Sequence, residues 1–235
     1  MNERVLKICA LGGPVTVLVS CVGWLIGGVL PLPLGPADSR AEVYAFYTDH
    51  DTRLKIGLTV VSLAICLVIL LFAAITVVLL EIEGRRPVLT MVQAFASATT
   101  VVLLLVPMLL MLVTAFRADT RSPELVQTLN DASWLLFITP IAPFIIQNVA
   151  IGAAVLSDRN GLLPRWVGYA NFWIALSFLP DVLAYFFFSG VFAWNGVLVF
   201  WLALTTYSVF LVVMGVAVFR AASHLPRAEL APATV

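Results

Sequence analysis

Residues 56–80 read IGLTVVSLAICLVILLFAAITVVLL, without a charged side chain. A helix needs about 20 predominantly apolar residues to cross the hydrocarbon core of a bilayer, and this stretch is longer than that. A strand of a transmembrane β-barrel would instead alternate apolar and polar residues over about ten positions. The stretch therefore predicts a transmembrane helix and excludes a barrel strand.

Further apolar runs repeat this character along the chain. Hydrophobic residues make up 62% of the 235 residues and charged residues 11%, whereas about a quarter of a soluble domain is charged. We expect an all-α, polytopic membrane protein whose residues 1–235 form a single helical-bundle domain. Its six transmembrane helices are expected at residues 8–30, 56–80, 88–116, 134–156, 167–189 and 197–219. The first run is longer than the apolar part of a typical secretory signal, so we interpret it as a membrane anchor.

The basic residues predict the orientation, because Lys and Arg resist translocation and collect in cytoplasmic segments. An N-in/C-in topology places more of them inside than outside. The inner segments would hold Arg4, Lys7, Arg85, Arg86, Arg159, Arg165, Arg220 and Arg227, and the outer loops Arg40, Arg53, Lys55, Arg117 and Arg121. The sequence thus predicts a multi-pass protein of the bacterial inner membrane, with both termini in the cytoplasm and lipids around the bundle.

Two outer loops carry helix-start signals. Ser39 and Glu42 have the spacing of a capping box at the start of residues 40–50. In the next outer loop, Ser122 is a suitable N-cap and Pro123 a suitable first residue for a helix over residues 124–130. Both loops are therefore expected to form short amphipathic helices on the membrane, as lids over a cavity or as caps over helix ends.

Asp181 is the carboxylate expected deepest within an apolar run. It follows Pro180, which lacks an amide hydrogen and should break the fifth helix. A rise of 1.5 Å per residue places it about 12 Å below the outer surface. An ionisable residue at this depth is expensive and usually functional. Asp181 is a candidate for coupling a proton or cation to transport, and the alternative is a protonated side chain that ties the break to a neighbouring helix.

Other polar residues in the apolar runs define a candidate intramembrane polar site around Asp181. Its predicted members are Thr139, Gln147, Asn148, Asn171, Thr205 and Thr206, with Ser20 at a similar depth and Thr100 deeper. Buried amides most often join helices, and contact with a substrate is the alternative. Pro140 and Pro143 should distort the fourth helix just before its two amides.

The residue types that build catalytic or metal centres are scarce. The chain has only two histidines, His50 and His224, and Cys9, Cys21 and Cys66 lack metal-ligand spacing. The cysteines are expected to be small apolar core residues, and a Cys21–Cys66 link is the alternative. The sequence therefore predicts a protein that is not an enzyme, with no catalytic residue, no cofactor and no metal site, and without a nucleic-acid-binding module.

Three segments resemble a known group of proteins. AEVYAFY at residues 41–47, the following Arg53 and Gly57, and LPRWV at residues 163–167 are similar to a loosely related group of bacterial, actinobacterial six-helix integral membrane proteins. That group has no assigned activity. The resemblance implies the fold and a membrane location, and it transfers no site residues.

Two classes of function fit the sequence. The first is an accessory or assembly subunit of a larger membrane complex, favoured by the small size and by the lack of a catalytic or coupling set. The second is a small transporter or binding protein for an apolar or lipid-like molecule, with Asp181 in its site. A GxxxG motif at Gly23 and Gly27 permits close approach of another helix, either in this chain or in a membrane protein partner or second copy.

Overall fold

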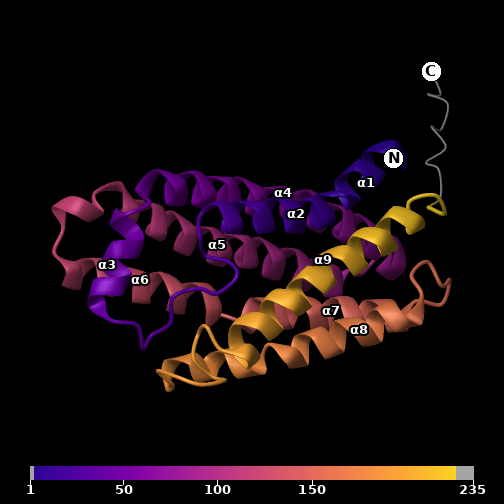
Figure 1. The fold of residues 1–235 in the computed structure, drawn as a ribbon. Helices are drawn as coiled ribbons and strands as arrows, with labels where there is room; N and C mark the ends of the chain where they lie inside the picture. Colours follow the sequence, from indigo (N-terminus) through magenta and orange to yellow (C-terminus); the bar gives the residue numbers. More distant parts are fainter. Residues whose placement is uncertain (1–2, 226–235) are drawn as a thin grey trace.

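The computed structural model describes residues 3–225, and within this range every regular element is a helix (Figure 1). Six helical segments of the described range are long and apolar enough to cross a membrane. The expected all-α architecture with six membrane-spanning segments is therefore confirmed. Arg227, which entered the prediction of orientation, lies outside the described residues.

The six spans are built from eight α-helices and two irregular helical segments of the described range. They are α1 (Glu3–Ala10) with α2 (Gly12–Ile26), α4 (Asp51–Glu83), α5 (Val88–Phe116), α6 (Pro123–Ile138) with α7 (Ala142–Ser157), α8 (Arg165–Ser177) with the 3₁₀ segment η2 (Leu179–Tyr185), and the π-helical segment η3 (Val197–Trp201) with α9 (Leu202–Ala221). The connections contain α3 (Arg40–Thr48) and the short η1 (Ala118–Thr120).

The spans lie side by side in one elongated bundle (Figure 1). Helix α1 and the last turns of α9 lie at one end, which we call the α1 end. Helix α3 lies across the opposite end, beside the start of α6, and we call this the α3 end (Figure 1). Burial of apolar side chains between the helices forms one continuous core that includes Leu71, Ile75, Ile151 and Phe210.

The predicted N-caps of α3 and α6 are present, but the predicted end of the second of these helices is wrong. Ser39 accepts a hydrogen bond from the Glu42 amide, and the Glu42 carboxylate accepts one from the Ser39 amide, which completes the capping box of α3. Ser122 caps α6 with Pro123 in its first turn. The expected short helix at residues 124–130 is not a separate element, however. No proline or glycine interrupts residues 124–138, so α6 continues directly into the fourth span.

The GxxxG motif is used inside this chain. A Cβ atom added to Gly57 of α4 would lie 2.5 Å from the Gly23 carbonyl oxygen and 2.5 Å from the Gly27 nitrogen of α2. Contacts of that length are impossible for a real side chain, so only glycine lets the two backbones come this close. The motif therefore packs α2 against α4, and of its two predicted uses the structure shows the intramolecular one.

Polar contacts join the segments at the α3 end. The buried Tyr47 hydroxyl of α3 donates to Asn130 Oδ1 of α6 over 3.1 Å, and Trp194 Nε1 donates to the Leu34 carbonyl over 2.8 Å. Burial, together with the nearby charge of Asp131, raises the pKa of Tyr47, so its hydroxyl keeps the proton that it donates. The Tyr47 bond ties α3 to α6, as expected of a cap over helix ends, and the Trp194 bond fixes the segment that precedes α3.

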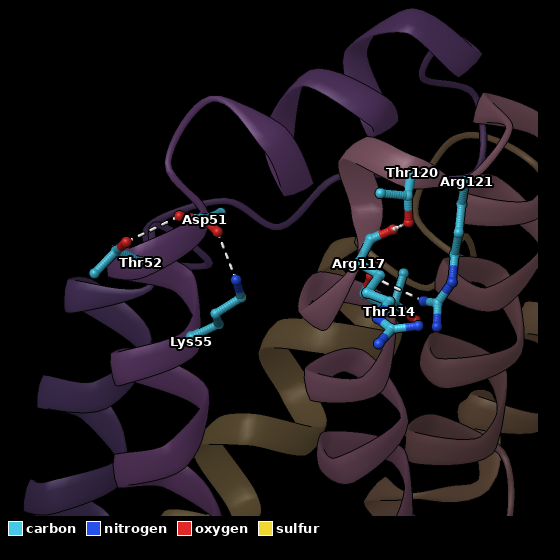
Figure 2. Close-up of polar contacts among 7 residues, drawn as sticks. All are labelled: Asp51, Thr52, Lys55, Thr114, Arg117, Thr120 and Arg121. Carbon is cyan, nitrogen blue, oxygen red and sulfur yellow. Dashed lines mark hydrogen bonds and ion pairs between the residues drawn. The ribbon is translucent and has the colours of Figure 1, made fainter.

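Charged side chains complete the helix ends at this end of the bundle (Figure 2). Arg121 donates to the carbonyl oxygens of Val113 and Thr114 over 2.7 and 3.1 Å. These carbonyls belong to the last turn of α5, where no following amide is available to them. Asp51 accepts hydrogen bonds from Thr52 and Lys55 in the first turn of α4 (Figure 2). Arg121 and Lys55 thus serve local helix termini.

Candidate ligand cavity between the six spans

The fourth, fifth and sixth spans are each irregular beside a central cavity. Helices α6 and α7 are separated at residues 139–141, where Pro140 and Pro143 prevent regular hydrogen bonding. Helix α8 ends at Ser177, and the chain continues as the 3₁₀ segment η2, which contains Pro180. The break that Pro180 predicts is present, and the expected end of the fifth span at residue 189 is wrong, because the helical segment ends at Tyr185. The sixth span begins with the π-helical turn η3.

A side-chain hydrogen bond joins two of these irregular segments. The hydroxyl groups of Thr139 and Tyr185 lie 2.6 Å apart, which connects the α6–α7 break to the end of η2. Thr139 also donates to the Leu135 carbonyl within α6. This bond therefore holds the end of η2 against the α6–α7 break.

The cavity has a volume of about 120 Å³, and its lining residues come from all six spans. Most of its wall is apolar. Its hydrogen-bonding side chains are Thr16, Ser20, Thr100, Asp181, Tyr207 and Ser208. Thr16 and Thr100 already donate to carbonyl oxygens of helix backbones, and Ser208 donates to Leu204 O. The wall also contains the indole N–H of Trp24, and its fully buried polar atoms without a partner in residues 3–225 are Asp181 Oδ1 and the Tyr207 hydroxyl oxygen.

Asp181 lies in η2 with only 1% of its surface exposed. Its Oδ1 atom has no hydrogen-bond partner within residues 3–225, and neither does the buried Tyr207 hydroxyl oxygen. Among the described residues that line the cavity, none is Lys, Arg or His. A buried carboxyl group without a partner is costly unless it is neutralised or paired. The cavity thus contains one acidic group whose partner the surrounding helices do not supply.

Two groups of aromatic side chains form much of the cavity wall. In the first group, the Trp24 ring lies 5.7 Å from Phe137 and 6.0 Å from Phe200, measured between centroids. In the second, the Phe144 ring lies 4.5 Å from Phe178 and 5.1 Å from Tyr207. Phe178 immediately precedes η2, so this second group is adjacent in sequence to the segment that carries Asp181.

The structure brings only part of the predicted polar site to the cavity. Asp181 lines it together with Ser20, which is expected at a comparable depth, and with Thr100, which is expected deeper. Thr139 is buried at the neighbouring break and contacts Tyr185. Thr206 donates to the Leu202 carbonyl within α9.

Thr205 is exposed on α9 and does not line the cavity. The π-helical turn before α9 changes the number of residues per turn, so the face that α9 presents could not be derived from regular helical spacing. Thr205 and Asp181 are therefore not part of one site.

The predicted amides lie outside the cavity, buried between helices. Asn148 donates to the Phe144 carbonyl over 2.9 Å, and Asn171 donates to the Val167 carbonyl and to the Met214 sulfur. Gln147 is fully buried, and neither of its side-chain polar atoms has a partner within residues 3–225. The Asn171–Met214 contact joins α8 to α9, which is the helix-joining role expected of such residues.

The sequence analysis missed several cavity residues that a helical spacing would have indicated. Thr16 and Trp24 lie four residues before and after the expected Ser20 and therefore share its face of α2. On α9, Leu204, Tyr207, Ser208 and Leu211 follow the spacing of a single helical face. The signal was the presence of polar and aromatic side chains on one face of an otherwise apolar helix.

Residues 3–225 contain no disulfide bond and no cluster of metal-ligating side chains. Cys9, Cys21 and Cys66 are free thiols, so the alternative of a Cys21–Cys66 link is not realised. No group of three or more His, Cys, Asp or Glu side chains within residues 3–225 is arranged to hold a metal ion. Comparison with protein families, with curated proteins and with solved structures finds no match to this chain.

Proposed function

We propose that this protein binds a small amphiphilic molecule, apolar or lipid-like over most of its surface, in the central cavity, and moves it across the membrane. The observation that carries this proposal is the position of Asp181, an unpartnered carboxyl group in the wall of a largely apolar cavity. Most ligand pockets have this composition, with apolar walls and a few polar groups that orient the ligand.

The irregular backbone around the cavity supports the same proposal. Unpaired backbone groups are expensive in hydrocarbon, and non-helical backbone at membrane depth is tolerated where it is buried in protein or lines a cavity. Transporters commonly form their sites from discontinuous helices of this kind. The breaks at residues 139–141 and at η2 both border the cavity, since Pro140 and Asp181 are among its lining residues.

The accessory role that the sequence favours would need a docking face, and the GxxxG motif does not supply one. Gly23 and Gly27 would have offered a docking face to a membrane protein partner or to a second copy, but Gly57 of the same chain occupies that face. We therefore place the transporter or binding function first. Stoichiometric association with another chain is the competing outcome that the experiment below distinguishes.

In the membrane, we propose an N-in/C-in topology for a bacterial inner-membrane protein, with the α1 end in the cytoplasm and the α3 end outside. The excess of Lys and Arg in the segments of the α1 end supports this orientation. In this orientation α3 lies over the outer ends of the spans. Modification of single cysteines at Arg86 and at Arg121 by an impermeant reagent in intact cells tests it, since only the second position should react.

Native mass spectrometry of the protein, gently extracted from its own membrane, tests the proposed function. We expect one chain, or a homo-oligomer, that carries a defined small molecule. Asp181→Asn should lose this molecule, and Asp49→Asn, at an exposed position of the α3 end, should retain it. Stoichiometric partner chains without a bound small molecule would establish the accessory role instead.

A further inference from the structure

We infer that the ligand group held beside Asp181 is an alkylammonium head, so that the transported amphiphile is an organic cation bound in exchange for a proton. This inference rests on the proposed function and specifies its substrate class. It starts from charge: the cavity wall contains a carboxyl group, and no Lys, Arg or His among the described lining residues balances it. Either a proton or a cationic ligand must neutralise the carboxylate.

The aromatic walls fit a cation and not merely an apolar group. The faces of Trp, Tyr and Phe rings attract ammonium groups, and this attraction strengthens when water is excluded. Trp24, Phe137 and Phe200 form one aromatic group of the cavity wall, and Phe144, Phe178 and Tyr207 form the other. A carboxylate combined with several aromatic rings is the recognition chemistry of quaternary and tertiary ammonium heads.

The cavity volume agrees with a compact head. At about 120 Å³ it is somewhat smaller than an engineered protein cavity of about 150 Å³ that holds benzene. A trimethylammonium group is of this size. The cavity residues Ser20, Cys21, Ala203 and Leu204 are only half-buried, so the cavity is not fully enclosed between α2 and α9.

Exchange with a proton follows from the same geometry. Without a cation, the buried carboxyl group holds a proton, because an unpaired charge in this wall is costly. When the ammonium group enters, the Asp181 O–H bond breaks, the electron pair stays on the carboxylate, and the proton leaves to water. One proton is therefore released for each cation bound.

Few other titratable groups face the cavity. They are the Cys21 thiol of α2 and the Tyr207 hydroxyl of α9, while the lining residues from α4, α5, α6, α7 and η3 include none. Within η2, Tyr185 is engaged with Thr139 instead. Proton release coupled to binding therefore points to Asp181.

A pair of isosteric probes tests the inference on the full chain in lipid nanodiscs. Choline carries a trimethylammonium head, and 3,3-dimethylbutan-1-ol has the same shape without the charge. In isothermal titration calorimetry we expect choline to bind at least about tenfold more tightly. Titrations in buffers of different ionisation enthalpy should show about one proton released per choline and none with the alcohol.

Variants make the test specific. Asp181→Asn should abolish the proton release and remove the preference for choline, and Asp49→Asn should change neither. Trp24→Leu should weaken choline binding several-fold while leaving the alcohol nearly unaffected. This second variant and the proton count on the unchanged chain keep the test decisive if Asp181→Asn does not fold.

The outcomes separate the two proposals. Equal binding of both probes without proton release would overturn the cation assignment and leave the cavity as a site for neutral amphiphiles. The cation assignment also fails if neither probe binds while the native mass spectrum shows a small molecule. Absence of a bound molecule in both experiments would overturn the proposed function as well.

Discussion

The two halves of the bundle use the same kinds of apolar residues but are built differently. In the first half, α4 continues without a break from Asp51 to Glu83, and Gly57 brings its backbone into direct contact with α2. In the second half, the fourth, fifth and sixth spans are all irregular near the cavity. Close helix packing leaves no room for a ligand, whereas broken helices create space and polar groups. The comparison indicates a closely packed α2–α4 scaffold, one face of which lines the cavity that the three irregular spans complete.

The largest effect is expected from breaking the scaffold. Gly57→Val places a side chain where a Cβ alone would lie 2.5 Å from two backbone atoms of α2. The helices must separate, and overpacking of this kind costs about 3 kcal/mol of unfolding free energy. Unfolding in mixed micelles measures the change. Cys66→Ala, at an exposed position of the same helix, is the control and should alter stability by less than about 0.5 kcal/mol.

A change in the cavity wall should affect binding more than stability. Trp24→Leu removes the ring that contacts both Phe137 and Phe200, and the affinity for an ammonium probe should fall several-fold. Trp173→Leu removes an exposed tryptophan of α8 and should leave the affinity unchanged. Calorimetry with choline compares the two. An equal loss in both variants would contradict a specific role of the cavity wall.

A substitution that removes the bond between α3 and α6 should have an intermediate effect on the free energy of unfolding. Tyr47→Phe leaves the buried Asn130 Oδ1 atom without its donor and should destabilise the fold by about 1 kcal/mol. Tyr44→Phe removes only a long contact of 3.5 Å near the surface and serves as the control. If both variants unfold at the same temperature, α3 is not fixed by this bond and could act as a lid.

The smallest effect is expected at the contact between two helix breaks. Thr139→Val removes the hydrogen bond to Tyr185 and should cost about 0.6 kcal/mol, the average for such bonds in membranes. Thr206→Val is closely matched, because Thr206 also donates to a carbonyl one turn earlier but is not bonded to another span. The difference between the two unfolding free energies isolates the contact, and a zero difference would mean that the breaks are independent.

Part of the fold and of the candidate site can be predicted from the sequence alone. Length and apolarity located all six spans, and the combination of Pro180 with Asp181 located the most important break. Prolines and isolated carboxylates are informative because each has a large, local energetic consequence in a membrane.

What the sequence did not predict depends on helix rotation and on contacts between distant residues. Regular spacing groups Tyr207 and Ser208 on one face of α9 and leaves Thr205 off it, but it does not say that this face borders the cavity, which depends on how α9 packs after the π-helical turn η3. The continuity of α6 could have been inferred from the absence of a breaker before Pro140. The aromatic grouping could not, because Trp24, Phe137 and Phe200 come from three different spans.

The most direct test of a ligand cavity between the six spans uses the protein's own cysteines. Cys21 lines the cavity, and Cys66 is exposed on the outside of α4. We predict that 2-aminoethyl methanethiosulfonate modifies Cys21 and not Cys66 in nanodiscs, and that choline slows the reaction, as followed by mass spectrometry. An unreactive Cys21, or one that choline does not protect, would contradict a cavity that binds ammonium groups.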